Sequence, residues 1–149
     1  MLFRSLRDAK PALGVWDVRN GPGRLMDIEL GAQTLALLAA SPERGVEAQI
    51  VAGHEAGSAS TMPESDAQAL LSGYRLMWRL HAAIRLLTDG VFDFGSAGEG
   101  ARAFVLRETG MDNEGALAEA LDRARRAVDG AVTRLVGAAT EGERGDGSG

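Results

Sequence analysis

Three charged residues follow a short glycine-rich segment, and their types and spacing are suited to chemistry. Arg24, Asp27 and Glu29 come directly after Gly21-Pro22-Gly23. A guanidinium fork can bind a phosphate or a carboxylate, and neighbouring acids can hold that fork in place. In a simpler interpretation Asp27 caps backbone N–H groups and Arg24 pairs with Glu29 on the surface, for about 0–1 kcal/mol. Capping alone needs neither the arginine nor the second acid, so we favour the functional interpretation.

The residues after the glycine segment predict the helix that positions this charged cluster. Pro22 suits a first helical position, because its missing N–H needs no partner there. We therefore expect a helix from Pro22 to about Leu38, with Asp27 and Glu29 near its positive end. Gln33 lies one turn after Glu29 and shares its face. Apolar side chains at spacings of three and four are typical of a buried helical face, and they are Leu25, Ile28, Ala32, Leu35 and Ala39.

This stretch resembles a signature of bacterial glutamine synthetase adenylyltransferases. That signature reads Asp-x-Lys, then Gly-Gly-(hydrophobic)-Arg-Asp-Ile-Glu-Phe-x-x-Gln. The chain has Asp17-Val18-Arg19, then Gly-Pro-Gly-Arg-Leu-Met-Asp-Ile-Glu-Leu over residues 21–30, then Gln33. A second segment, residues 74–80, resembles the family's Ala-Tyr-x-Phe-Leu-Arg-x-Leu-Glu-His-Arg-Leu-Gln helix.

The chain departs from the family pattern at several positions. Gly-Pro-Gly replaces the double glycine, Arg19 replaces the lysine and Leu30 replaces the phenylalanine. The family's Glu-His-Arg triplet is absent at His81-Ala82-Ala83. The resemblance covers residues 1–87 and extends more loosely to residue 135.

In the resembled family, this signature belongs to the helical domain that follows a nucleotidyltransferase domain. The resemblance therefore implies a non-catalytic helical domain that supports or regulates ATP-dependent adenylylation of glutamine synthetase in nitrogen control. The implied partners are an upstream nucleotidyltransferase domain, glutamine synthetase and a PII-type signalling protein, and the parent enzyme would use Mg²⁺ and ATP. The residues implied at a domain interface or in support of the active site are Arg19, Gly21, Gly23, Arg24, Asp27, Glu29 and Gln33.

The carboxylates that nucleotidyl transfer needs to hold Mg²⁺ are missing from this sequence. In the resembled family they come from a Gly-Ser-x-x-Asp-x-Asp motif, whereas here Asp93 precedes Gly95-Ser96 and lacks a second acid. We expect that the chain alone is not an enzyme and transfers no AMP to glutamine synthetase. Two other interpretations stay open: the helical domain of a related uridylyltransferase, and a free-standing helical module that binds a protein partner. A purely structural bundle, whose charged helix start is only a cap, is a third.

Composition limits the class of protein. The chain has 149 residues, no cysteine, 45% hydrophobic and 5% aromatic residues, and a net charge of −5. This length suits one domain, and a core of alanine and leucine favours helix. The acidic balance argues against a nucleic-acid surface, and no stretch approaches the ~20 apolar residues of a membrane span. The absence of cysteine fits a cytoplasmic location.

The periodicity of the whole chain predicts an all-α bundle of about five to six helices with one long central helix. We expect a helical domain over residues 1–136 and a flexible Gly-rich tail over 137–149. The expected helices besides the signature helix cover residues 1–10, 42–53, 63–88 (the longest), 101–109 and 112–136. The first of these begins without a cap, which is expected of a piece of a longer protein. Residues 12–20 are expected as an extended loop held by Trp16, since no partner strand is visible.

Several side chains outside the signature are expected to have structural roles. We expect His54 in an exposed loop, and Tyr74 and His81 at the edge of the core. We expect Trp78 to pack in the core, the alternative being an anchor for a partner. Phe92 and Phe94 are expected to lie over the bundle. Glycines are expected to end two helices, at Gly90 and Gly110. An arginine-rich group on the last helix is interpreted as a solvated face and not as a phosphate site, because acids interleave it. The group comprises Arg123, Arg125, Arg126 and Asp129.

Overall fold

A computed structural model describes residues 14–55 and 62–145 of the chain, with side chains described as far as Gly137. The described part contains helices and no strand, which confirms the predicted all-α class. The expected helix over residues 1–10 lies outside the described residues. The helices are α2 (Leu25–Leu38), α3 (Val46–Glu55), α4 (Glu64–Leu87), α5 (Glu99–Thr109) and α6 (Glu114–Gly145).

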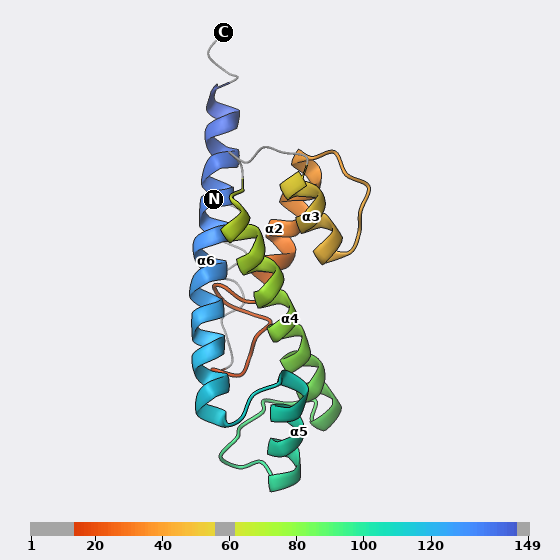
Figure 1. Cartoon of the computed structure of the whole chain (residues 1–149), viewed down its shortest axis with the longest axis vertical. Helices are drawn as coiled ribbons and strands as arrows, with labels where there is room; N and C mark the ends of the chain where they lie inside the picture. The colour runs from red at the N-terminus through yellow and green to blue at the C-terminus, as the bar shows by residue number, and fades with distance from the viewer. Residues whose placement is uncertain (1–13, 56–61, 146–149) are drawn as a thin grey trace.

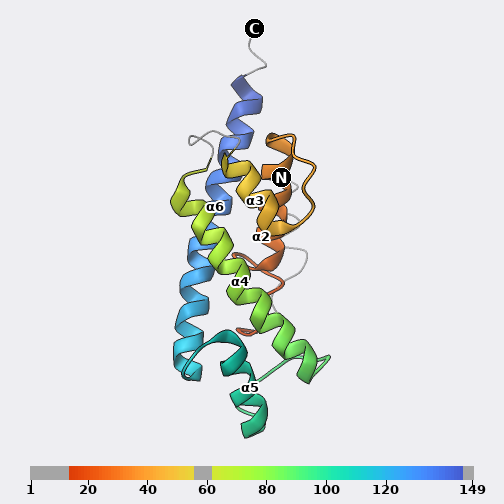
Figure 2. The ribbon, with the colours of Figure 1, turned by 45° about the vertical axis from the view of Figure 1, so that its right-hand side comes forward.

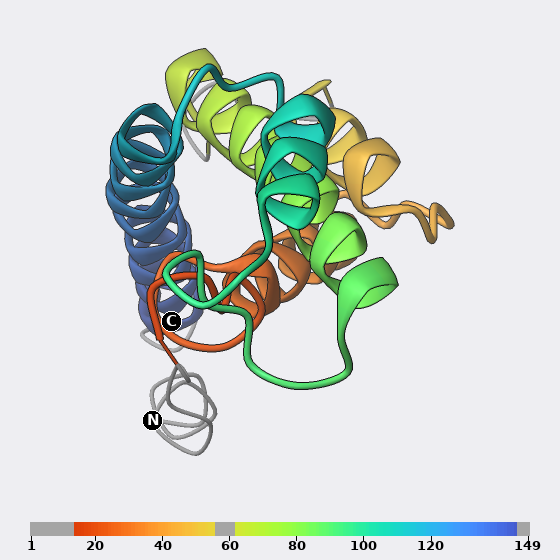
Figure 3. The ribbon, with the colours of Figure 1, turned by 90° about the horizontal axis from the view of Figure 1, so that it is seen from below.

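Two long helices, α4 and α6, pack against each other and form the length of the bundle (Figure 1). α2 packs against α3, α4 and α6, whereas α3 also contacts α4. Figure 2 shows α5 at the end of the bundle opposite the C-terminus, where it contacts α4 and α6. Seen from below, the segment before α2 runs beside the loop before α5 (Figure 3). That pairing agrees with the contact between Trp16 and Phe94.

The predicted apolar faces of the helices form one core. Each fully buried leucine or isoleucine contributes about 1.5–3 kcal/mol relative to exposure. Phe92 and Phe94 are buried, as predicted, with their rings edge to face. Close helix contact depends on small residues: a Cβ at Gly73 in α4 would lie 2.7 Å from the Val128 side chain of α6. Fully buried core side chains include Leu25, Ile28, Leu35, Ile50, Leu70, Met77, Leu80, Leu117, Leu121, Val128 and Leu135.

The signature helix begins later than we predicted. α2 starts at Leu25 with Arg24 as its N-cap residue, so Pro22 is not its first helical residue. Gly23 has φ +70, a left-handed conformation that interrupts any helix running from Pro22 into α2. The N–H groups of Leu25 and Met26 donate to the carbonyls of Val18 and Arg19 instead. The connector before α2 thus supplies part of its N-terminal cap.

The predicted boundaries of the second helix, 42–53, are also wrong. α3 begins at Val46, because the chain first turns through Ala40 with φ +50 and through a turn in which Glu43 N–H donates to Ser41 Oγ. α3 continues to Glu55 and includes His54, which we had placed in an exposed loop. The His54 ring is half-buried, with Nδ1 3.2 Å from the carbonyl oxygen of Met62.

The end of α4 differs from the prediction as well. Its predicted span, 63–88, is confirmed within a residue, but Gly90 is not a left-handed cap. Thr88 leaves the helix with φ −157 and ψ 150, and its Oγ1 accepts a hydrogen bond from Gly90 N–H at 3.0 Å. Gly110, by contrast, ends α5 at φ 71, as predicted.

The last helix is longer than predicted. Asn113 caps α6 as expected, because its Oδ1 accepts from Ala116 N–H at 2.8 Å. The helix then reaches Gly145 and has 32 residues, so α6 and not the 24-residue α4 is the longest helix. The predicted end near Val136 is therefore wrong. The flexibility of the segment after it stays a prediction, and residues 146–149 lie outside the described part.

Candidate functional site

An open groove lies between the connector before α2, the second half of α4 and the loop after α4. Its volume is about 240 Å³. Asp17 and Arg19 of the signature line one side, and His81 and Arg85 of α4 line the other. These four residues are ionisable, and they are set among apolar lining side chains such as Ile84 and Phe92. We take this groove as the candidate functional site.

The contacts that hold the connector in place include a ring contact, a buried side chain and a turn. The ring centroids of Trp16 and Phe94 are 4.7 Å apart, which confirms the expected anchoring by Trp16. Val18 is buried. The carboxylate of Asp17 accepts hydrogen bonds from the N–H groups of Arg19 and Asn20, at 3.0 and 3.3 Å. This turn leaves the Arg19 side chain exposed at the groove.

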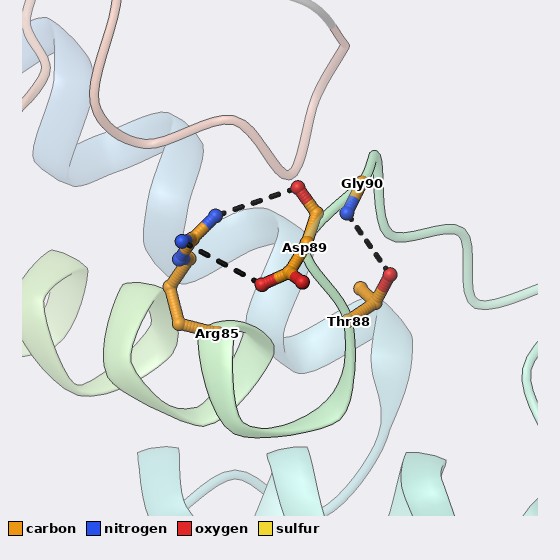
Figure 4. Close-up of polar contacts among 4 residues, drawn as sticks. All are labelled: Arg85, Thr88, Asp89 and Gly90. Atoms are coloured by element: carbon orange, nitrogen blue, oxygen red, sulfur yellow. Dashed lines mark hydrogen bonds and ion pairs between the residues drawn. The ribbon is translucent and has the colours of Figure 1, made fainter.

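The far wall of the groove contains a surface ion pair (Figure 4). Arg85 Nη2 lies 3.7 Å from a carboxylate oxygen of Asp89, and Arg85 Nη1 donates to the Asp89 carbonyl at 3.4 Å. Both side chains are exposed, so the pair contributes little to folding. Arg85 therefore remains available to a ligand or a partner.

His81 belongs to the same wall as Arg85 and also contacts a row of aromatic rings on α4. The Tyr74 and Trp78 rings are 6.1 Å apart, and the Trp78 and His81 rings 6.0 Å apart. Partial burial lowers the pKa of His81, and Arg19 and Arg85 lower it further, while Asp17 and Glu29 oppose the shift. His81 is thus biased toward its neutral form, which can both donate and accept a hydrogen bond.

The burial of these rings only partly matches the prediction. Tyr74 and His81 are half-buried, as expected for the core edge. Trp78 is 47% exposed and does not lie in the core as we expected. The α4 positions that face the core include Leu70, Met77 and Leu80, whereas Trp78 lies on the surface beside them. Burial also raises the pKa of Tyr74, with smaller contributions from Glu29 and Glu47.

The glycine turn of the signature packs on the other side, against α6. A Cβ at Gly23 would lie 2.2 Å from the backbone oxygen of Arg125, so only glycine fits this contact. Gly21 is buried and has φ 103. The Asp27 carboxylate is buried and accepts from Gly23 N–H at 2.7 Å. An acid at this third helical position that reaches back to a backbone N–H is a capping interaction, which supports the simpler interpretation of Asp27.

Arg24 does not pair with Glu29 in the described structure. Its Nη1 donates to the Asn20 carbonyl at 2.9 Å, while its buried Nε has no hydrogen-bond partner. Burial lowers the pKa of Arg24, and nearby Arg125 lowers it further, although Asp17 opposes the shift. Arg125 is half-buried, so its placement on a solvated face was wrong. Its position one turn after the core residue Leu121 was the sequence signal that we missed.

The predicted site residues thus lie in two separate parts of the fold, the groove side and the side that faces α6. Arg19 lines the groove, and Glu29 lies close enough to Tyr74 and His81 to raise both pKa values. Gln33 is exposed. Gly23, Arg24 and Asp27 belong to the side that faces Arg125. The signature therefore serves two places in the fold and not a single charged cluster.

Within the described part of the chain, no group of three or more potential metal-ligating side chains occurs. None of the described helices is long and apolar enough to cross a membrane.

The comparisons with known proteins place this bundle among nucleotidyltransferase-related helical domains. Residues 5–136 match the model of the family described as GlnD PII-uridylyltransferase, and the chain belongs to this family. The chain is also 36% identical over 103 residues to a bifunctional glutamine synthetase adenylyltransferase/adenylyl-removing enzyme of Rhizobium meliloti (strain 1021). That match confirms the resemblance drawn from the signature. It covers 66% of this chain but only 10% of the relative. No solved structure matches.

Proposed function

We propose that this chain is a non-catalytic helical domain that supports or regulates ATP-dependent adenylylation of glutamine synthetase. The observation that carries the proposal is the groove in which Asp17 and Arg19 of the signature face His81 and Arg85 of α4. The similarity to the bifunctional adenylyltransferase supports this choice. In the cell the domain would serve nitrogen control in the cytoplasm, and a PII-type signalling protein would regulate the parent enzyme.

The groove residues would act on a neighbouring nucleotidyltransferase domain of the same protein. That domain would bind Mg²⁺ and ATP and would carry the catalytic carboxylates. Arg19 and Arg85 offer guanidinium groups that suit acidic side chains of the transferase or the phosphates of its bound nucleotide. Glu29 supplies a negative charge on the adjoining surface. These groups would orient the two domains, while the chemistry takes place outside this chain.

A second candidate is the corresponding domain of a uridylyltransferase, which the description of the matching family favours. The two candidates differ in substrate: glutamine synthetase with ATP, or a PII-type protein with UTP. The groove is compatible with either, because its arginines would contact the transferase domain and not the protein substrate.

The proposal is tested in the parent enzyme with Arg19→Gln and Glu29→Gln. Either change should lower the rate of adenylylation of glutamine synthetase while leaving the melting temperature unchanged, because both side chains lie outside the core. Arg102→Gln is the control, since Arg102 is an exposed arginine on α5, away from the groove. Transfer of UMP to a PII-type protein with no transfer of AMP would favour the second candidate. Normal rates of both transfers in both variants would refute a role for the groove.

A further inference from the structure

The glycine turn brings two arginines together from distant parts of the sequence. Gly23 approaches the backbone of Arg125 so closely that a Cβ at residue 23 would lie 2.2 Å from the Arg125 carbonyl oxygen. Arg24 is the next residue and therefore begins α2 beside this turn of α6. The two guanidiniums are near enough for Arg125 to lower the pKa of Arg24.

Among the described residues, the hydrogen bonds of these two side chains go to uncharged groups. Arg24 Nη1 donates to the Asn20 carbonyl, and Arg125 Nε donates to the Leu121 carbonyl at 3.3 Å. Both acceptors are neutral. The Nε of Arg24 is buried without any hydrogen-bond partner. No ion pair to either arginine is found in the described part of the chain, and Asp122 pairs with Arg126. Asp17 near Arg24 and Asp122 near Arg125 act to raise the two pKa values, but both pKa values are lowered overall, with burial as the main cause.

Two adjacent cations that are partly removed from water repel each other unless an anion lies between them. From this geometry we infer that Arg24 and Arg125 form a binding site for a phosphate group. A phosphate carries close to two negative charges at neutral pH and so matches two guanidiniums, whereas a carboxylate carries one. Guanidinium forks also match the oxygens of phosphate with paired hydrogen bonds.

The backbone N–H groups at the start of α2 are not the donors of this phosphate site. Its Leu25 and Met26 N–H groups already donate to the carbonyls of Val18 and Arg19, and Asp27 places a carboxylate in its first turn. The donors of the phosphate site are therefore side chains. The inference rests on the proposed function only for the expectation that the phosphate belongs to a nucleotide, since binding is a property of this chain.

Isothermal titration of the 149-residue chain with inorganic phosphate, ATP and UTP tests the inference, at an ionic strength matched with chloride. Arg24→Gln and Arg125→Gln should each weaken phosphate binding by about tenfold or more, because each removes a charge-assisted hydrogen bond. Arg123→Gln, an exposed arginine of the same helix, should bind as the unchanged chain does. Tighter binding of the nucleotides than of phosphate would identify a nucleotide as the source. No binding of any of the three, or binding by both variants as tight as that of the unchanged chain, would overturn the inference.

Thermal melting separates this site from a purely structural role. Without phosphate, Arg125→Gln should melt at or above the temperature of the unchanged chain, because the repulsion of Arg24 is relieved. Added phosphate should raise the melting temperature of the unchanged chain and of Arg123→Gln, but not of Arg125→Gln. A lower melting temperature of Arg125→Gln, together with no effect of phosphate on the unchanged chain, would overturn the inference. In that case normal adenylylation by the parent enzyme would leave the proposed function standing.

Discussion

The glycine turn and the groove are built from the same signature, yet they differ in how tightly their residues are held. At the turn, Gly23 lies against the backbone of α6, and the buried carboxylate of Asp27 holds the Gly23 N–H. At the groove, the Arg19 and Arg85 side chains are exposed, and Arg85 has only a weak surface partner in Asp89. Residues of the turn thus determine where the segment sits, and residues of the groove remain available for contact.

This difference separates two kinds of constraint within one motif. A close backbone approach admits only glycine, and a buried N–H needs an acceptor, so both requirements follow from folding. An exposed arginine has no such requirement, because surface substitutions usually change stability by about 0.5 kcal/mol or less. Substitutions at the turn should therefore affect folding, whereas substitutions at the groove should affect function.

Among the signature residues, the largest effect is expected for Gly23→Ala. The left-handed conformation costs about 1 kcal/mol for alanine, and the clash with the Arg125 carbonyl adds about 1–3 kcal/mol. Gly110→Ala is a matched control, because Gly110 has φ 71 but no atom within 4 Å of a Cβ. Chemical denaturation gives the loss of unfolding free energy in each variant, and the difference between the two losses is the cost of the clash. Equal losses of unfolding free energy would show that the contact with α6 yields easily.

A smaller loss is expected for Asp27→Ala. Removing the carboxylate leaves the buried Gly23 N–H without its acceptor, at a cost of about 1–3 kcal/mol. Glu29→Ala removes the second acid of the signature from a half-exposed position and should change the unfolding free energy by about 0.5 kcal/mol or less. Denaturant titrations of the two variants make the comparison. A similar effect of both would contradict the division between a structural and an available acid.

The sequence predicted the helices and most of the core, because apolar spacing alone determines which helical face is buried. The α2 face from Leu25 to Leu35 and the α6 face from Leu117 to Leu135 are examples. Helix starts were harder to predict: the glycine turn at Gly23 and the turn after Ala40 displace both α2 and α3 from their expected first residues. A proline at a suitable position indicates only where a helix is permitted to begin.

The composition of the site was less predictable than the fold. Arg19 was expected from the signature, but its neighbours His81 and Arg85 come from α4, and their proximity depends on tertiary packing. Arg125 was assigned to solvent, because interleaved acids suggested a wet face. Its actual neighbour, Arg24, is far away in the sequence. Side-chain pairs of this kind have no local signal in a single sequence.

Arg85→Gln tests the groove as a region that contributes little to stability. Its exposed pair with Asp89 should be worth about 0–1 kcal/mol, so the unfolding free energy should fall by no more than that. Met77→Ala, which empties a buried position on the same helix, should cost about 2–5 kcal/mol and serves as the contrast. Denaturation of the two variants under one set of conditions provides the measurement. A loss for Arg85→Gln comparable to that for Met77→Ala would remove the distinction between groove and core.

The smallest expected effect is the pH dependence that His81 contributes to stability. Burial, Arg19 and Arg85 lower its folded-state pKa below the unfolded value of about 6.5, despite Asp17 and Glu29. As pH falls through about 6.5, the unfolded chain takes up the proton first, so the free energy of unfolding decreases until the pH reaches the folded-state pKa. His81→Gln should lose this part of the pH dependence, because its side chain does not titrate. The free energy of unfolding of this variant and of the unchanged chain is measured between about pH 5 and pH 8. The difference between the two curves separates the contribution of His81 from that of the carboxylates.

A direct titration of His81 separates the effect of Arg19 and Glu29 on its pKa from the effect of burial. The chain has two histidines, so a His54→Gln background leaves one imidazole to follow by NMR. In that background Arg19→Gln should raise the pKa of His81, because Arg19 now lowers it, and Glu29→Gln should lower the pKa further. Opposite shifts from these two variants would establish that the signature charges and α4 share one electrostatic environment across the groove. If neither substitution moves the pKa, Arg19 and Glu29 do not act on His81, and burial with Arg85 and Asp17 sets its pKa.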